Sequence, residues 1–187
     1  MAQSLEKICV PICVKSARDL DSAVARACEV GDLIELRFDC LEPAELGQAL
    51  AVTRPLLSKL ARPFIVTYRS AEEGGKCVLD REARLKFWLF DRPREAAFYD
   101  IELDLVEGLA ASDFGQHDVN WSAVICSHHD YAGVPGDLEQ IYERMTRTPA
   151  RVMKIAVQGD DITDCIPVFD LLERARREGR ELIAIAM

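Results

Sequence analysis

Hydrophobic and polar positions alternate along this chain between two periods. Short apolar runs, rich in β-branched residues, are each followed by a segment whose apolar positions recur every three or four residues. The short runs predict strands at residues 8–14, 33–38, 64–68, 98–103, 121–127, 152–157 and 182–187. The other segments predict helices at residues 16–30, 43–60, 80–90, 106–111, 137–145 and 161–178. Ser16 is expected to be the N-cap of the first helix. The pattern predicts seven strands and six helices in strict alternation.

Strict alternation of strands and helices is typical of right-handed parallel βα units. Such units build either an open doubly wound sheet or a (β/α)8 barrel. A dinucleotide-binding fold carries a glycine-rich loop after its first strand, whereas residues 10–16 contain no glycine. Polar residues at the carboxyl ends of several predicted strands fit the active-site face of a barrel. We therefore expect an α/β fold of the (β/α)8 TIM-barrel class, with residues 1–187 as a single domain. A complete barrel usually needs about 250 residues, and this chain reaches only its seventh predicted strand.

One lysine lies in the middle of a predicted strand. Lys154 lies in the short run 151–157, in which every residue from 152 onward other than the lysine is apolar. A buried strand is a costly place for an ammonium group, and desolvation favours the neutral amine, which is the nucleophile. The alternative is a structural lysine whose ammonium reaches solvent at the end of the strand.

A second apolar strand ends in His-His-Asp, at residues 128–130. His129 is a candidate general acid and base, because histidine titrates near neutral pH. Its alternative is a histidine that caps the end of the strand. A zinc site is disfavoured, because His128 and His129 point to opposite faces of a strand and the third histidine, His117, lies in a polar loop. Together, the lysine and the histidine predict imine chemistry.

The remaining candidates follow the second and third predicted strands. Arg69 begins a polar loop that is either a solvated surface loop or a binding segment. In the second interpretation, Arg69 binds a carboxylate or hydroxyls and Glu73 reaches a catalytic histidine. Residues 74–75 then form a mobile glycine turn. Glu35 and Arg37 share one face of their strand. Either they form an ion pair with each other inside the barrel, or they bind a polyhydroxylated substrate.

Composition narrows the classes of partner and compartment. The chain has 32 acidic and 23 basic residues and a net charge of −9, which argues against nucleic acid or an anionic membrane as the main partner but leaves room for a small anionic substrate. No apolar run approaches the roughly 18 residues of a membrane span, and residues 1–7 lack a signal-peptide pattern. The seven cysteines include no Cys-x-x-Cys pair, so we interpret them as small buried hydrophobes of a reducing cytoplasm.

These motifs, in this order, resemble the type I 3-dehydroquinate dehydratases of the shikimate pathway. The signature of that family is matched by Asp-Ile-Glu-Leu at residues 100–103, followed after twenty residues by Val-Ile-Cys-Ser-His-His-Asp at 124–130. Further stretches agree, at residues 35–39, 67–70, 73–75 and 154–157. The resemblance extends from about Lys7 to Met187.

The resemblance implies a barrel that converts 3-dehydroquinate to 3-dehydroshikimate and water, without a metal or other cofactor. Lys154 is then expected to form an imine with the C3 ketone. His129 is expected to remove the C2 proton and later to protonate the departing C1 hydroxyl, while Glu73 orients it. The substrate's hydroxyls and neighbouring groups are expected to be held by Glu35, Arg37 and Arg69. The resemblance also implies a homodimer.

The sequence departs from the family after its seventh predicted strand. Family members continue with a substrate-binding arginine and with a serine and a glutamine on a closing loop, whereas this sequence ends at residue 187. We therefore expect a barrel that lacks its last strand, last helices and substrate-closing loop, with weak or no turnover. Two other interpretations remain open: an impaired or non-catalytic binding fragment of the same fold, and another Schiff-base barrel of the class I aldolase kind. The aldolase interpretation shares Lys154 but does not explain the His-His-Asp motif.

Overall fold

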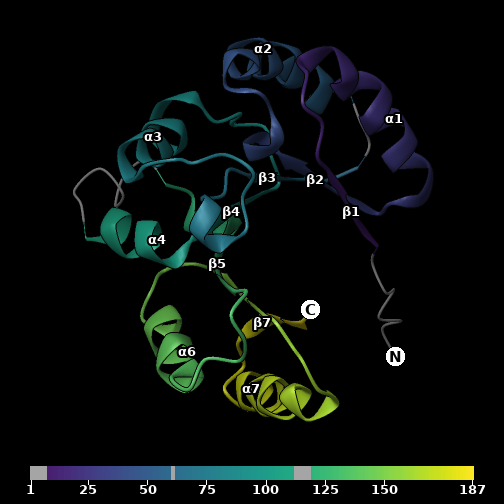
Figure 1. Cartoon of the computed structure of the whole chain (residues 1–187). Helices are drawn as coiled ribbons and strands as arrows, with labels where there is room; N and C mark the ends of the chain where they lie inside the picture. The colour runs from purple at the N-terminus through teal and green to yellow at the C-terminus, as the bar shows by residue number, and fades with distance from the viewer. Residues whose placement is uncertain (1–7, 60–61, 112–118) are drawn as a thin grey trace. The chain divides into compact units, whose positions relative to one another are not determined.

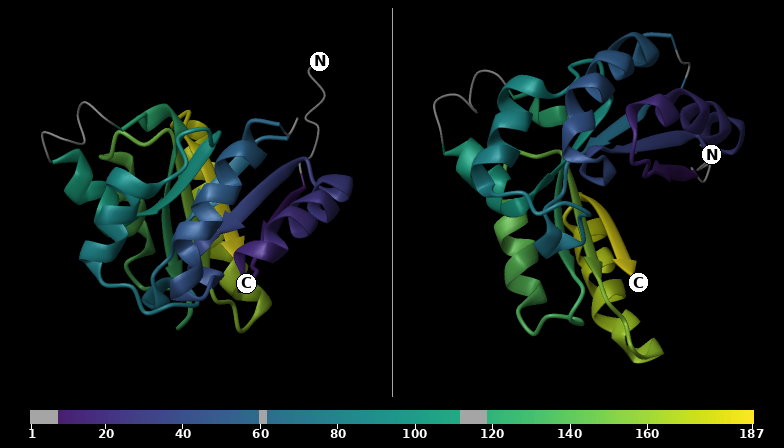
Figure 2. Two further views of the ribbon diagram at one scale, coloured as in Figure 1. Left: turned by 90° about the horizontal axis from the view of Figure 1, so that it is seen from above. Right: turned by 45° about the horizontal axis from the view of Figure 1, so that its top comes forward.

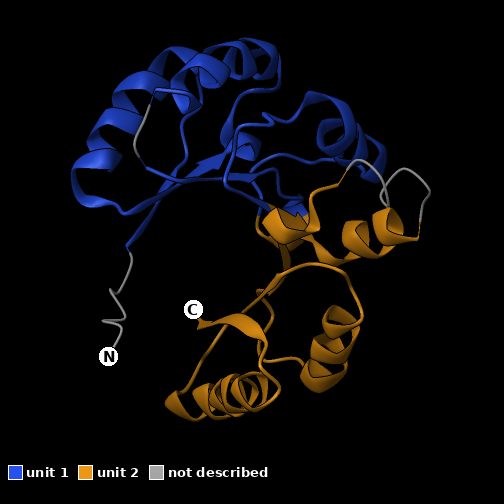
Figure 3. Ribbon diagram, turned by 180° about the vertical axis from the view of Figure 1, so that it is seen from behind, with its two compact units in different colours: residues 1–71, 75–99 blue, residues 72–74, 100–187 orange. Residues whose placement is uncertain are grey.

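The computed structural model describes residues 8–59, 62–111 and 119–187. Two compact units, coloured separately in Figure 3, are formed by residues Met1–Ala71 with Gly75–Tyr99 (unit 1) and Glu72–Gly74 with Asp100–Met187 (unit 2). Along the described chain, strands and helices alternate from the N-terminal to the C-terminal end (Figure 1).

Unit 1 contains three parallel strands that neighbour one another in chain order. Its main elements are β1 (Cys9–Ile12), α1 (Leu20–Val30), β2 (Leu33–Arg37), α2 (Leu46–Leu57), β3 (Phe64–Thr67), α3 (Arg81–Lys86) and the start of β4 (Phe98–Glu102). Short 3-10 turns cover η1 (Ala17–Asp19), η2 (Phe38–Cys40) and η3 (Pro43–Glu45), and a π-helical turn, η5 (Phe87–Asp91), follows α3. In the register of the strands, Cys9 pairs with Leu33 and Ile34 pairs with Phe64. Helices α1 and α2 pack side by side (Figure 2).

The core of unit 1 explains why its strands read as apolar runs. All four residues of β3 are buried, as expected for a parallel strand covered on both faces. The ring of Phe87 stacks on Tyr68 with centroids 4.3 Å apart and meets Trp88 edge to face. Asp80 caps the start of α3, because its carboxylate accepts the N–H of Ala83 at 2.7 Å. Aromatic burial and a capped helix thus anchor the segment that follows β3.

Unit 2 contains a second set of parallel strands. Its elements are the end of β4, α4 (Leu103–Ala110), η6 (Trp121–Ala123), β5 (Val124–Asp130), α6 (Leu138–Thr146), β6 (Val152–Val157), η7 (Ile162–Asp164), α7 (Cys165–Arg177) and β7 (Glu181–Ala186). Strand β6 pairs with β5 on one side and β7 on the other. Ser127, Lys154 and Ile183 therefore form one row across these strands, and His129 stands in a row two residues further on, beside Ala156.

Every strand and helix predicted from the sequence has a counterpart, with shifted ends. Strand β5 begins at Val124 because residues 121–123 form a 3-10 turn, and it continues to Asp130, so His128 and His129 lie inside the strand rather than after it. Ser16 stands at the N-cap position of η1, the 3-10 turn that leads directly into α1, but its side chain makes no capping hydrogen bond. Its hydroxyl donates to the carboxylate of Glu45 at 2.9 Å, and α1 begins later. The last residue of the predicted helix 43–60 lies outside the described residues.

The interpretation of the cysteines as buried, reduced residues is corrected by the structure. Cys13, after β1, forms a disulfide with Cys40 of η2. Of the five cysteines outside this disulfide, only Cys126 is buried. The fold brings Cys13 and Cys40 together because β1 and β2 are neighbouring parallel strands whose carboxyl ends lie at the same edge.

In the described part of the chain, no helix combines the length and apolar character that crossing a membrane requires. That residues 1–187 form one domain stays a prediction.

Candidate active site

Lys154, on β6, is paired with a buried carboxylate. Its side chain is 14% exposed, and its Nζ donates to Oδ2 of Asp100 at 2.8 Å. The other oxygen of Asp100, Oδ1, accepts the hydroxyl of Ser127 at 2.6 Å. The lysine is therefore mostly buried, as predicted, but its ammonium has a specific counter-ion that the sequence analysis did not foresee.

His129, on β5, is held by Glu73 through two hydrogen bonds. The backbone N–H of His129 donates to Oε2 of Glu73 at 3.1 Å, and its ring Nδ1 lies 3.1 Å from the same oxygen. A neutral imidazole that donates from Nδ1 to a carboxylate carries its lone pair on Nε2, which is the tautomer a general base needs. The predicted pairing of Glu73 with the histidine is present in the structure.

Strand register places Lys154 and His129 on the same face of the sheet in unit 2. Ser127 stands directly beside Lys154, and His129 follows Ser127 by two residues on the same strand. Residues two apart on a strand point to the same side, so the lysine and the histidine project from the same face in successive rows. The amine of Lys154 and the imidazole of His129, a possible proton acceptor, therefore lie on the same face of the sheet.

The second histidine of the motif lies on the other face but reaches the same glutamate. Nδ1 of His128 is 3.7 Å from Oε1 of Glu73. Burial lowers the pKa of His128 below its ordinary value, with a smaller opposing effect from Asp130. An open cavity of about 590 Å³ is lined here by Glu72, Glu73, His128, His129, Asp130, Tyr131 and Ala132. The Glu73–His129 pair thus lies at the wall of a space large enough for a small molecule.

The glycine after Glu73 is required by the local packing. Gly74 has a φ of +81°, which a side chain disfavours, and a Cβ atom there would lie 2.3 Å from the ring of Tyr131. We expected residues 74–75 to form a mobile turn. In the structure, Gly74 lies close to the ring of Tyr131, and the mobility of this turn stays a prediction.

The predicted substrate-binding residues lie in unit 1, with Glu35 in the middle of β2, Arg37 at the end of β2 and Arg69 two residues beyond the end of β3. Oε1 of Glu35 accepts the hydroxyl of Thr67 at 2.7 Å. Arg37 makes a bidentate ion pair with Asp39, in which Nε donates to Oδ1 at 2.8 Å and Nη2 to Oδ2 at 2.6 Å. Arg69 is buried, with 4% of its surface exposed. Glu35 and Arg37 thus each have a well-defined partner of their own.

Asp39 is a further residue of this region that sequence reasoning missed. Burial acts to lower the pKa of Arg37, but the hydrogen bonds and charge of Asp39 outweigh it, so the pKa lies above its ordinary value. Oδ2 of Asp39 also accepts the backbone N–H of Lys76 at 3.2 Å. The fully buried Asp39 therefore joins the end of β2 to the loop after β3.

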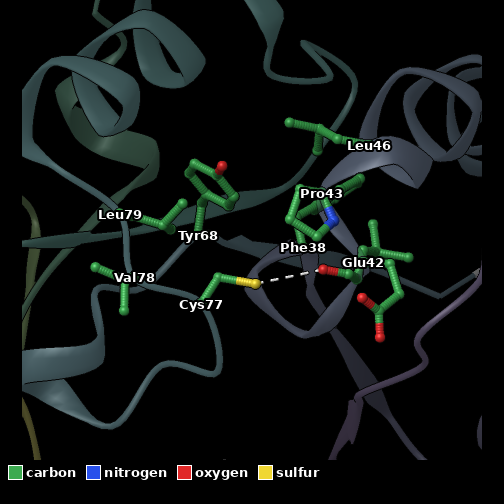
Figure 4. A pocket seen from close by; sticks show the side chains of 9 residues that line it. Phe38, Glu42, Pro43, Leu46, Tyr68, Cys77, Val78 and Leu79 are labelled. Atoms are coloured by element: carbon green, nitrogen blue, oxygen red, sulfur yellow. Dashed lines mark hydrogen bonds between the residues drawn. The ribbon is translucent and has the colours of Figure 1, made fainter.

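Unit 1 also contains an apolar cavity of about 240 Å³, shown in Figure 4. It is lined by Phe38, Leu41, Glu42, Pro43, Leu46, Tyr68, Cys77, Val78 and Leu79. The thiol of Cys77 donates to the carbonyl of Leu41 at 3.4 Å, and burial raises the pKa of Cys77. Burial also raises the pKa of Tyr68 to about 12. Both groups stay protonated at neutral pH, so this cavity offers no activated nucleophile.

In the described ranges, no group of three or more His, Cys, Asp and Glu side chains is arranged to hold a metal ion. His117, which entered the zinc interpretation, lies outside those ranges.

Comparison with known proteins identifies the family. A model of the family described as type I 3-dehydroquinase matches residues 8–187. The chain belongs to this family. The 3-dehydroquinate dehydratase of Methanothermobacter thermautotrophicus is 31% identical over 170 residues, which are 89% of this chain and 72% of that protein. The bifunctional 3-dehydroquinate dehydratase/shikimate dehydrogenase of Arabidopsis thaliana is 28% identical, over 90% of this chain and 28% of that protein.

Solved structures of the family share the fold. The 3-dehydroquinate dehydratase of Geobacillus kaustophilus superposes with a TM-score of 0.83 at 25% identity, covering 98% of this chain and 74% of that one. The type I enzyme of Clostridium difficile, solved with covalently modified comenic acid, has a TM-score of 0.76 at 26% identity, covering 97% of this chain and 75% of that one. These likenesses confirm the predicted α/β fold of the TIM-barrel class.

Proposed function

We propose that this chain dehydrates 3-dehydroquinate to 3-dehydroshikimate through an imine on Lys154. The observation that carries the proposal is the placement of Lys154 and His129 on one face of neighbouring strands, each paired with a carboxylate. Membership of the family supports the choice of substrate. The relative solved with covalently modified comenic acid is in keeping with covalent chemistry.

In this mechanism the Lys154 ammonium first transfers a proton to His129, and the resulting neutral amine attacks the C3 ketone. His129 returns the proton as water leaves, which gives a protonated imine. The imine draws electrons from the neighbouring carbon, so the C2 proton becomes acidic. Nε2 of His129 removes that proton, with the resulting imidazolium stabilised by Glu73 at 3.1 Å. His129 then protonates the C1 hydroxyl as it leaves, and hydrolysis of the imine releases the product. Every proton that moves in the elimination passes through one histidine.

Substrate recognition is assigned in this proposal to Glu35, Arg37 and Arg69. Glu35 and Arg37 are positioned by Thr67 and Asp39, which suits residues that must present fixed polar atoms to ring hydroxyls. The high pKa of Arg37 keeps its guanidinium charged at any working pH.

The proposal extends to a homodimeric, cytoplasmic protein with one domain over residues 1–187. Family membership and the prevalence of two-fold oligomers support the dimer, which sedimentation velocity would test. In a cytoplasmic protein, the reducing compartment would keep Cys13 and Cys40, which form a disulfide in the structure, as thiols. Thiol alkylation in fresh extract distinguishes the two cases, because a cytoplasmic protein should have both cysteines labelled.

The direct test follows 3-dehydroquinate by NMR in the presence of the protein. The proposal predicts 3-dehydroshikimate, whereas carbon–carbon cleavage fragments would favour an aldolase and binding without conversion would favour a non-catalytic module. Lys154→Ala should abolish conversion. Lys86→Ala, which removes an exposed lysine of α3, is the matched control and should leave it intact.

A further inference from the structure

A buried carboxylate connects the strand of the proposed imine lysine to the strand of the histidine. The side chain of Asp100 is 2% exposed and accepts from Lys154 at 2.8 Å and from Ser127 at 2.6 Å. We propose that Asp100, oriented by Ser127, is the counter-ion of the Lys154 imine and sets the plane in which it forms. This inference rests on the proposed function and assigns to Asp100 and Ser127 roles in the same site.

Ser127 fixes the rotation of the carboxylate. A carboxylate only accepts hydrogen bonds, so the Ser127 hydroxyl must donate to Oδ1 of Asp100. Ser127 is fully buried inside β5, where its position is set by the pairing of β5 with β6. With Oδ1 held in this way, Oδ2 is directed at Nζ of Lys154. Three strands thus supply the three groups, and none of them depends on a loop.

The charge beside Asp100 is the same before and after imine formation. When an ammonium condenses with a ketone, nitrogen forms its bond to the carbonyl carbon and two of its protons leave with the carbonyl oxygen as water. One N–H and one positive charge remain on nitrogen. Asp100 therefore faces a cation in both states, and the low polarity of a buried site strengthens the attraction. This attraction stabilises the electron-poor imine on which the acidity of C2 depends.

The single N–H of the protonated imine makes Asp100 an orienting group as well. The C=N bond and its substituents are planar, so the direction of the N–H fixes the plane that contains C3 and C2. Oδ2 of Asp100 is the acceptor toward which Nζ already points. His129 lies two residues beyond Ser127 on the same face of β5. The carboxylate thus holds the C2–H bond in a constant direction relative to the base.

The inference is tested by trapping the imine in D2O. Protein and 3-dehydroquinate are mixed, borohydride is added at set times, and the Lys154 peptide is analysed by mass spectrometry after digestion in H2O. The yield measures imine formation, and deuterium in the adduct measures removal of the C2 proton. We compare Asp100→Asn and Ser127→Ala with Asp170→Asn, which changes an exposed aspartate of α7.

For Asp100→Asn we expect C2 deuteration per trapped imine to fall about 100-fold, the scale of losing a preorganised electrostatic contact. For Ser127→Ala we expect about a tenfold loss, as for one hydrogen bond to a charged group. A purely structural role would lower the yield of folded protein but not deuteration per imine. If Asp100→Asn fails to fold by circular dichroism, Ser127→Ala decides, because it keeps the ion pair. Deuteration per imine equal to that of Asp170→Asn would overturn the inference and leave the proposed function standing. No adduct from the unmodified protein would overturn both.

Discussion

Replacement of Glu73 by glutamine isolates the contribution of one charge to the proposed proton transfer. In the structure, Oε2 of Glu73 accepts both the backbone N–H and the ring Nδ1 of His129, each at 3.1 Å. Glutamine keeps the length of the side chain and an acceptor oxygen but removes the charge. The imidazolium that forms when His129 takes a proton would then lose its counter-ion.

The size of the effect follows from the ring bond, because this is the bond that gains charge when His129 takes a proton. A hydrogen bond to a charged group contributes about 1.5 to 3 kcal/mol, so we take the loss as about 2 kcal/mol. Because 1.36 kcal/mol corresponds to a tenfold change in rate, proton removal should slow about 30-fold. Glu73 is only 16% exposed, so solvent screens little of this interaction.

The assay is the exchange of the C2 proton of 3-dehydroquinate with D2O, followed by NMR. Glu82→Gln, which neutralises an exposed glutamate on α3, serves as the matched control and should exchange at the rate of the unmodified protein. If Glu73→Gln exchanges within about threefold of that rate, Glu73 is not the counter-ion of the histidine, and the reasoning is wrong.

Three further predictions concern the parts of the fold around these residues. The Cys13–Cys40 disulfide closes a loop with a sequence separation of 27, so Cys13→Ser should lower the free energy of unfolding by about 3 to 4 kcal/mol in urea, and identical curves with and without dithiothreitol would contradict this. Gly74→Ala should destabilise the fold by about 1 to 3 kcal/mol through its positive φ. Gly136→Ala, at a position with open space, is the control and should leave the stability unchanged. Equal melting temperatures of the two variants would contradict the argument. Because burial lowers the pKa of His128, the unfolded chain binds more protons as pH falls below about 6.5, so stability should decline there and His128→Asn should flatten that dependence. Parallel pH curves for the two proteins would count against it.

The alternation of strands and helices could be predicted from the sequence because each element carries its own hydrophobic period. The ends of β5 could not, since nothing local to residues 121–123 distinguishes a 3-10 turn from the start of a strand. The Cys13–Cys40 pair was also missed. Two cysteines 27 residues apart meet only because β1 and β2 are neighbours.

Some residues of the candidate site could likewise be predicted from the sequence, and others could not. Lys154 and His129 could be proposed from the sequence because a charged or titratable residue inside an apolar strand is unusual. Asp100 has the same signal, a carboxylate next to an apolar run, and it lies within a motif that carried the family resemblance. Its role stayed hidden because the partner that explains it is 54 residues away, on β6. The role of Asp39 was likewise not predicted, because it depends on the hydrogen bonds that Asp39 accepts from Arg37 and from the backbone N–H of Lys76.

The measurement that tests the central claim most directly is borohydride trapping with peptide mapping. The protein is incubated with 3-dehydroquinate, reduced with borohydride and digested, and the modified residue is located by mass spectrometry. The account predicts one stable adduct, on Lys154, which disappears in Lys154→Ala and persists in Lys86→Ala. An adduct on another lysine, or none from protein that is folded and binds the substrate, would contradict it.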